Sequence, residues 1–344
     1  MNKKYSIKDV AKLSNVSVAT VSRVINNNGR FSEETRQRVL DAIAELNYEQ
    51  NKLAVSLRKN KSNTIGILVP DITNEFYSAV VKKCEQNLFA AGFSSIVCNT
   101  ERSLSREQNY LKVLSEHMVD GLIIISANDN AEESLNIRVP VVYIDRNPHL
   151  KDEFIITSDH YTGAQKATDF LIEHHYSPFI ITTKTNSSAT VERIKGFKDT
   201  LTAHNINDTN LERIIQLNIT SDQYLLENNE LDSFINSIKP QLSEQKIGVF
   251  AINDYIAFMV TRAAINRGIS IPDELSIIGF DDAPVSLIST PSISTVQQDT
   301  ATLAQRACHL IIKQLNPATN TKLTKKTELI PVKLILRGST PQSI

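Results

Sequence analysis

Residues 17–26 read SVATVSRVIN, a short stretch that decides how the start of the chain folds. Its apolar residues Val21, Val24 and Ile25 recur at helical spacing, so they predict one buried face of a short helix. Ser17 stands just before them and is a residue type whose hydroxyl caps helix N-termini. The stretch therefore predicts a helix over its whole length.

Two more helices are predicted around this one. Ser6, with Asp9 three residues later, is an approximate capping box that opens a helix from about Ile7 to Leu13. A third helix starts after Ser32, where acidic residues fill the first turn. Besides the three apolar residues above, the expected core residues are Ile7, Val10, Ala11, Leu13, Val39, Leu40, Ile43 and Leu46.

A tight turn at Asn15-Val16 joins the first two helices, and this arrangement is the helix-turn-helix pattern. In that pattern the second helix lies in the major groove of DNA. Arg23 is placed to reach guanine O6 and N7, while Val18 and Ala19 are placed to contact a thymine methyl group. A small helical cap whose arginine is merely solvated fits the same pattern.

Polar side chains and net charge also favour DNA as the partner of this N-terminal part. Contacts to phosphates fix the register of a protein on a duplex without reading its sequence. The candidates for such contacts are Thr20, Ser22, Asn26, Ser32 and Thr35, and Ser17 at the start of the helix is a further candidate DNA-contacting residue. Residues 1–63 hold 12 Lys and Arg against 6 Asp and Glu, whereas the remaining residues hold 25 against 32. A basic N-terminal part on an acidic remainder indicates that only the former meets a polyanion.

Residues 47–63, NYEQNKLAVSLRKNKSN, form a basic segment between this part and the rest. NKLAVSLR fits about two helical turns, and isolated helices of this length are marginal in water. Ala54 and Leu57 lie at positions i and i+3, so they would form a small apolar edge. A leucine presented in this way inserts between base pairs of the minor groove in some architectural proteins. A basic flexible linker fits the composition equally well.

From Thr64 onward, short apolar runs such as TIGILV, GLIIIS, FIITT and LSIIGF alternate with amphipathic stretches. This alternation is typical of parallel, doubly wound sheets. A chain of 344 residues also exceeds the size of one hydrophobic core. The sequence therefore predicts an α/β protein with an N-terminal helix-turn-helix domain and a body of two doubly wound parallel-sheet lobes.

Polar residues that directly follow strands are the candidates for a binding site, because ligands of open parallel sheets bind beyond the carboxyl ends of the strands. The candidates are Asn74, Phe76, Tyr77, Asp145, Arg146, Arg193, Asn253, Asp281 and Gln298. Carboxylates, amides and guanidinium groups beside aromatic rings suit a small polyhydroxylated molecule. Each residue alone fits a helix cap or loop equally well, so the prediction depends on their shared edge.

The sequence contains no motif that indicates an enzyme, a cofactor site or a metal site. The ten glycines never approach the spacing of G-x-G-x-x-G or a P-loop, and no G-x-S-x-G is present. The pair His174-His175 lacks partners at metal-ligand spacing. Cys84, Cys98 and Cys308 show no C-x-x-C spacing, which argues against a disulfide framework and a zinc site.

No apolar run of about 18 residues and no signal-peptide core occurs in the sequence. We therefore expect no membrane contact and a cytoplasmic location.

The stretches YSIKDVAKLSNVSVATVSRVIN, ETRQRVLDAIAELNY and NKLAVSLR together resemble the start of the LacI/GalR family of bacterial transcriptional repressors. DITNEFY, IDR, ATVERIKGF, AINDYIA and GFDD extend the resemblance along the body. It implies that the first three helices read half of a palindromic operator as part of a homodimer. It also implies a hinge helix that contacts DNA through Asn51, Ala54 and Leu57, with Leu57 in the minor groove.

The resemblance further implies a domain organisation. Residues 1–46 would bind DNA, residues 47–63 would form the hinge, and residues 64–344 would bind the effector and dimerise. The body is similar to periplasmic sugar-binding proteins, whose chain crosses three times between lobes. Lobe 1 would comprise about 64–160 and 295–324, and lobe 2 about 161–294 and 325–340.

The nine candidate pocket residues match, position by position, the pattern of pentose binders and of ribose binders in particular. The nearest candidate for an aromatic residue that closes the pocket is Tyr224. The resemblance thus implies a repressor of a carbohydrate operon that is controlled by a small sugar, with ribose favoured. The alternatives are sucrose or another sugar, a protein co-regulator, or a sugar-binding module without DNA activity.

Overall fold

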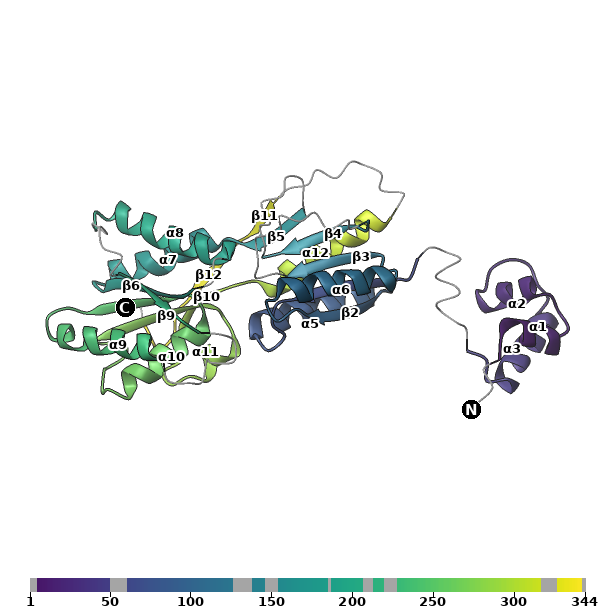
Figure 1. The fold of residues 1–344 in the computed structure, drawn as a ribbon, viewed down its shortest axis with the longest axis horizontal. Helices are drawn as coiled ribbons and strands as arrows, with labels where there is room; N and C mark the ends of the chain where they lie inside the picture. The colour runs from purple at the N-terminus through teal and green to yellow at the C-terminus, as the bar shows by residue number, and fades with distance from the viewer. Residues whose placement is uncertain are drawn as a thin grey trace. The chain divides into compact units, whose positions relative to one another are not determined.

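The computed structural model describes residues 5–49, 61–125, 138–145, 154–184, 187–206, 213–219, 228–316 and 327–341. The chain divides into two compact units, which are called here the head (Met1–Ser62) and the body (Asn63–Ile344). Each is described by itself (Figure 1). Within the described residues, no helix combines the length and the apolar character that crossing a membrane requires.

The head contains the three predicted helices, α1 (Ile7–Leu13), α2 (Val18–Ile25) and α3 (Glu33–Glu45). The Asp9 carboxylate accepts hydrogen bonds from the Ser6 backbone N–H at 2.8 Å and from the Ser6 hydroxyl at 2.7 Å. Ser17 caps α2 by accepting from the Thr20 N–H at 3.1 Å. These contacts satisfy backbone donors that the first turn of a helix leaves without a partner.

The core of the head is made by Val10, Ala11, Val21, Val24, Val39 and Ala42. Two predicted core residues are wrong, because Leu13 and Leu40 are 44% and 42% exposed. In α3 the inward residues follow the series Val39, Ala42 and Ile43, and Leu40 falls between the members of that series.

The body contains two six-stranded sheets, each at the centre of one lobe. Lobe 1 has the strand order β11-β5-β4-β3-β1-β2, and all of its pairs are parallel. Lobe 2 has the order β12-β10-β9-β8-β6-β7, and of these described pairs β10–β12 is antiparallel and the others are parallel. The strands of lobe 1 are β1 (Thr64–Val69), β2 (Ser94–Asn99), β3 (Gly121–Ile125), β4 (Val141–Ile144), β5 (Phe154–Ser158) and β11 (Thr327–Ile330). Those of lobe 2 are β6 (Ser177–Thr183), β7 (Ile214–Leu217), β8 (Ile247–Ala251), β9 (Leu275–Asp281), β10 (Ser294–Gln297) and β12 (Lys333–Ile335).

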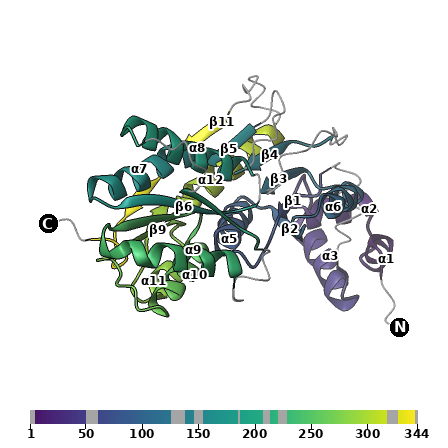
Figure 2. The same ribbon diagram turned by 60° about the vertical axis from the view of Figure 1, so that its left-hand side comes forward.

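Helices cover both faces of each sheet. In lobe 1, α5 (Glu75–Ala90) and α12 (Thr300–Leu315) share one face, and α6 (Leu104–Glu116) covers the other. Strand β1 alternates accordingly: Ile67 packs into the cluster of α5 and α12, whereas Leu68 packs with α6. In lobe 2, α7 (His160–Glu173) and α8 (Ser188–Ala203) lie side by side (Figure 2). The other helices among the described residues of lobe 2 are α9 (Asn229–Ile238), α10 (Asp254–Ile265), the short α11 (Pro284–Ile288) and the 3-10 helix η3 (Lys239–Ser243).

The chain passes between the lobes three times, from β5 to α7, from β10 to α12 and from β11 to β12. This number agrees with the resemblance, but two of the expected lobe boundaries are wrong. Strand β10 belongs to lobe 2, because Ser294–Gln297 pairs in register with Ile278–Asp281. Strand β11 belongs to lobe 1, because Thr327–Ile330 pairs with β5. Each of these strands has only four residues, and the local pattern does not reveal which sheet such a short strand joins.

Candidate functional site

A pocket opens in the body between the two lobes, beyond the carboxyl ends of strands from both sheets. Lobe 1 contributes Asn74, Phe76, Tyr77, Arg102 and Asp145, and lobe 2 contributes Thr183, Ser187, Ala189, Thr190, Arg193, Ile252, Asn253 and Asp281. Seven of the nine predicted ligand residues are in this lining. Gln298 lies behind it, hydrogen-bonded to Asp281, and Arg146 and Tyr224 lie outside the described residues. Their contact with a ligand stays a prediction.

The two pocket asparagines also cap helices, so a role as a helix cap and a role as a ligand-binding residue are compatible. Oδ1 of Asn74 accepts from the backbone N–H groups of Phe76 at 3.1 Å and Tyr77 at 3.2 Å. Oδ1 of Asn253 accepts from the Ile256 N–H at 2.9 Å. Each amide oxygen is therefore used by the backbone, and each Nδ2 remains as a donor. The pocket gains two fixed amide donors in this way.

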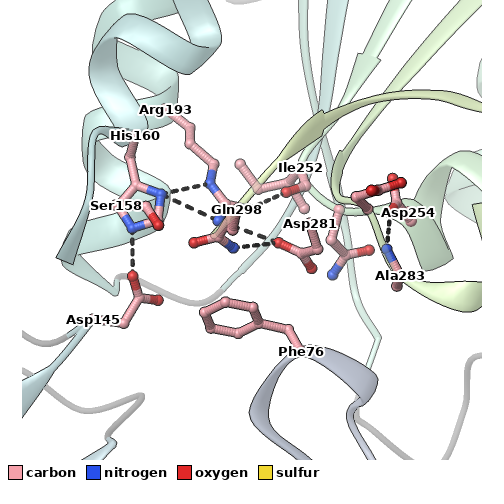
Figure 3. Close-up of polar contacts among 12 residues, drawn as sticks. Phe76, Asp145, Ser158, His160, Arg193, Ile252, Asp254, Asp281, Ala283 and Gln298 are labelled. Carbon is pink, nitrogen blue, oxygen red and sulfur yellow. Dashed lines mark hydrogen bonds and ion pairs between the residues drawn. The ribbon is translucent and has the colours of Figure 1, made fainter. Parts of the chain in front are cut away.

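A buried polar chain runs behind the pocket (Figure 3). Nε2 of His160 contacts Oδ1 of Asp145 at 2.5 Å, and Nδ1 accepts from Nε of Arg193 at 3.3 Å. Nη2 of Arg193 lies 3.2 Å from the same Nδ1 and 3.5 Å from Oδ1 of Asp281. Nε2 of Gln298 donates to Oδ1 of Asp281 at 2.7 Å. This chain of side-chain contacts thus joins both lobes and holds one oxygen of Asp145 and one oxygen of Asp281.

The Arg193 guanidinium has two further contacts besides those with His160 and Asp281. Nη1 donates to the backbone carbonyl of Ile252, and the Cζ atom lies 3.6 Å from the centre of the Phe280 ring. A guanidinium stacked on an aromatic face gains cation–π attraction and loses rotational freedom. Contacts within the protein therefore hold the Arg193 guanidinium in place.

The two pocket carboxylates differ in their protonation behaviour. Burial raises the pKa of Asp281 to about 6, although Arg193 and Gln298 act to lower it. Burial also acts to raise the pKa of Asp145, but His160, Arg193 and Thr157 outweigh it and lower that pKa below its ordinary value. Burial raises the pKa of the Tyr77 hydroxyl, which stays neutral. At neutral pH the pocket therefore presents two carboxylates, one of which is close to taking up a proton.

Both carboxylates also sit on unusual backbone. The φ angles of Asp145 and Asp281 are 59° and 117°, in the region where residues other than glycine are uncommon. Such backbone costs about 1–3 kcal/mol per residue and concentrates at functional sites. This feature is independent of the hydrogen bonds and favours the same two residues as parts of a site.

Sequence reasoning missed several pocket residues. Arg102, Thr183, Ser187, Ala189, Thr190 and Ile252 line the pocket, and His160 supports it from behind. Arg102 follows β2, Thr183 ends β6 and His160 follows β5. The rule that selects polar residues after strands would have found all three, had it been applied to every strand. Within the described residues, no group of three or more His, Cys, Asp or Glu side chains is placed to hold a metal ion.

In the head, most predicted DNA-contacting residues lie at the surface of α2 and the starts of α2 and α3. Ser17, Ala19, Arg23, Asn26 and Ser32 are exposed, and Thr20, Ser22 and Thr35 are half-buried. Val18 is also half-buried and packs against the core of the head, so less of it is left for a thymine methyl. Asn51, Ala54 and Leu57 lie outside the described residues. Contact of any of these residues with DNA stays a prediction.

A helix-turn-helix head joined to a two-lobed body with an interlobe pocket defines a class of ligand-responsive DNA-binding regulators. The sequence pattern of bacterial regulatory proteins of the lacI family matches residues 6–51. The pattern of a periplasmic binding protein-like domain matches residues 168–340.

Relatives extend the match to almost the whole chain. The ribose operon repressor of Halalkalibacterium halodurans is 32% identical over 97% of both chains. The ribose operon repressor of Bacillus subtilis is 34% identical over 89% of this chain and 90% of its own. The sucrose operon repressor of Pediococcus pentosaceus is 32% identical over 96% and 98%. The chain belongs to the LacI family of bacterial regulatory proteins, whose members here are transcriptional regulators, and this confirms that it is not an enzyme.

Solved structures share the fold. The Lac repressor dimer bound to operator and an anti-inducer has a TM-score of 0.84 at 24% identity, covering 98% of this chain and 99% of that one. A LacI family regulator from Enterococcus faecium with bound ribose has a TM-score of 0.66 at 26% identity, covering 80% and 98%. The predicted fold class is thereby confirmed.

Proposed function

We propose that this chain represses a carbohydrate-utilisation operon and that a small sugar, with ribose favoured, controls it from the interlobe pocket. The observation that carries the proposal is the arrangement of polar atoms around the pocket. Asp145 and Asp281 offer acceptors, Asn74 and Asn253 offer donors, and each is already held in place by the protein. Sugar hydroxyls act as donor and acceptor at once, so they match such a mixed set.

The relatives support the same ligand class. Two of them are ribose operon repressors, and the E. faecium regulator was solved with ribose bound. We propose that sugar binding changes how the two lobes are arranged and so lowers operator affinity, because a ligand shifts an equilibrium by its unequal affinity for the two states.

On the DNA side, we propose a homodimer in the cytoplasm that binds a palindromic operator. The exposed face of α2 would enter the major groove, with Arg23 reading a guanine. The solved Lac repressor, which shares this fold, is a dimer on its operator. Two-fold symmetry of the protein would then be matched by two-fold symmetry of the DNA site.

Calorimetry with ribose, sucrose, fructose and a purine tests the effector. We expect ribose to bind the wild-type protein and to be displaced by none of the others. Sucrose is the second candidate, because the P. pentosaceus relative at 32% identity is a sucrose operon repressor. A protein that binds none of these small molecules, yet binds operator DNA more weakly when a cell protein is added, would favour the protein co-regulator instead.

A further inference from the structure

His160 begins α7 directly after the first crossover between the lobes, and its imidazole is only 4% exposed. It does not line the pocket, yet it contacts a pocket residue of each lobe. Asp145 directly follows β4 in lobe 1, and Arg193 lies on α8 in lobe 2. The three side chains form one buried chain (Figure 3).

The hydrogen bonds fix the protonation of this imidazole. Arg193 has donors only, and both its Nε and its Nη2 lie within 3.3 Å of Nδ1. Nδ1 must therefore accept and carries no proton. The Asp145 carboxylate accepts, so Nε2 must carry the proton that it donates at 2.5 Å. His160 is thus a neutral imidazole with its proton on Nε2.

This arrangement has a consequence for the two charged groups. Asp145 and Arg193 are both buried and carry opposite charges, and buried opposite charges attract strongly. The imidazole lies between them, so Asp145 and Arg193 each contact His160 and do not pair directly with each other. Oδ2 of Asp145 has no donor among the described residues, because the contacts of His160 and Thr157 both go to Oδ1. It therefore remains as an acceptor for a ligand.

We propose that His160 is the positioning residue of the effector site: as a neutral spacer, it holds the Asp145 carboxylate and the Arg193 guanidinium apart and presents both to the sugar. This inference rests on the proposed sugar-binding function. Because His160 stands at a crossover, the same contacts make the pocket geometry depend on how the two lobes are arranged.

The first test needs no ligand. Nitrogen NMR of the full chain, labelled in its histidine rings and assigned with His160→Gln, reports which ring nitrogen carries the proton. We expect a protonated Nε2 and an unprotonated Nδ1 at neutral pH. A proton on Nδ1, alone or together with Nε2, overturns the inference whether or not any sugar binds.

The second test uses ribose affinity. His160→Leu keeps an apolar side chain of moderate size but removes both contacts, and we expect affinity to fall about tenfold or more. His160→Gln keeps one donor and one acceptor on the same side chain, and we expect affinity within about threefold of wild type. The matched control is His204→Gln, which breaks the partly exposed contact of 2.9 Å between His204 and Asp169 and should leave affinity unchanged.

Wild-type affinity in His160→Leu, or an equal loss in the glutamine and leucine variants, would mean that the imidazole only fills space. If His160→Leu does not fold, His160→Asn replaces it, because its shorter amide reaches one partner at most, and we expect a loss there too. If wild-type protein binds no ribose at all, the ribose assignment fails, while the ring-nitrogen spectrum still decides the role of His160.

Discussion

Gln298 donates a hydrogen bond of 2.7 Å to Oδ1 of Asp281, although Asp281 ends β9 and Gln298 follows β10. Arg193 contacts the same oxygen at 3.5 Å. No described residue donates to Oδ2 of Asp281, so the protein holds one oxygen of this carboxylate and leaves the other to the pocket. A carboxylate oxygen that lines the pocket is open to a donor from a ligand, and a sugar hydroxyl there would supply one.

Asp281→Asn should therefore lower ribose affinity about tenfold or more without unfolding the protein, because it replaces an acceptor by a donor. Calorimetry measures the affinity, and thermal unfolding checks the fold. The matched control is Asp273→Asn, which lies outside the pocket lining. Unchanged ribose affinity in Asp281→Asn would remove Asp281 from the site.

Ribose affinity should also depend on pH through this residue. The pKa of Asp281 in the free protein is raised to about 6, chiefly by burial. A sugar hydroxyl that donates to the carboxylate favours its charged form, so affinity should fall by up to about tenfold per pH unit below about pH 6. Calorimetry between roughly pH 5 and 8 measures this slope, and Asp281→Asn should flatten it. A slope that persists in the variant would assign the titration to another group.

The contribution of Asp281 to the stability of the sugar-free protein should change with pH in the direction opposite to ribose affinity: it should fall as the pH rises. A folded-state pKa raised from 3.8 to about 6 means that Asp281 stabilises the folded state below pH 3.8 and that this contribution is lost as pH rises through 6. The unfolding free energy of Asp281→Asn minus that of wild type should therefore grow by up to about 3 kcal/mol between acid and neutral pH. Taking the difference cancels the carboxylates that do not interact with Asp281, whereas Asp254, whose pKa the Asp281 charge raises, contributes to the difference in the same direction. Denaturant titrations of both proteins provide the measurement, and a difference that stays constant with pH would contradict this expectation.

The fold and the pocket were predictable from the sequence to different extents. The long apolar strands and their following polar residues are local features, so Asn253 and Asp281 could be found without knowing which strands pair. The sheet that a four-residue strand joins depends on contacts far along the chain, and β10 and β11 were therefore assigned to the wrong lobes. His160 was missed because it serves the pocket through other side chains and not by lining it.

Arg23→Ala should relax base preference at one operator position by about 1–3 kcal/mol, because one bidentate contact to guanine would be lost. Arg23 is exposed on α2, and a side chain at Gly29 would meet its Cδ at 3.4 Å, so its stem lies over the loop after the helix. Binding to a set of single-base operator variants measures the preference. The control is Lys12→Ala, an exposed charge in the last turn of α1, which should weaken all operators alike if it acts at all. The same uniform loss in Arg23→Ala would mean that Arg23 contacts only phosphate.

Asn74→Asp separates the two roles that this residue combines. An aspartate keeps an oxygen for the Phe76 and Tyr77 N–H groups, and a negative charge at the start of α5 is favourable, so stability should be maintained. The substitution removes the Nδ2 donor of a residue that lines the pocket, so ribose affinity should fall about tenfold or more. Asn74→Ala is the matched comparison, because it loses the cap as well and should lower the unfolding free energy by about 1 kcal/mol. If Asn74→Asp binds ribose as wild type does while Asn74→Ala is merely less stable, Asn74 is only a helix cap, and the donors to the sugar come from other residues of the pocket lining, such as Asn253 and Arg193.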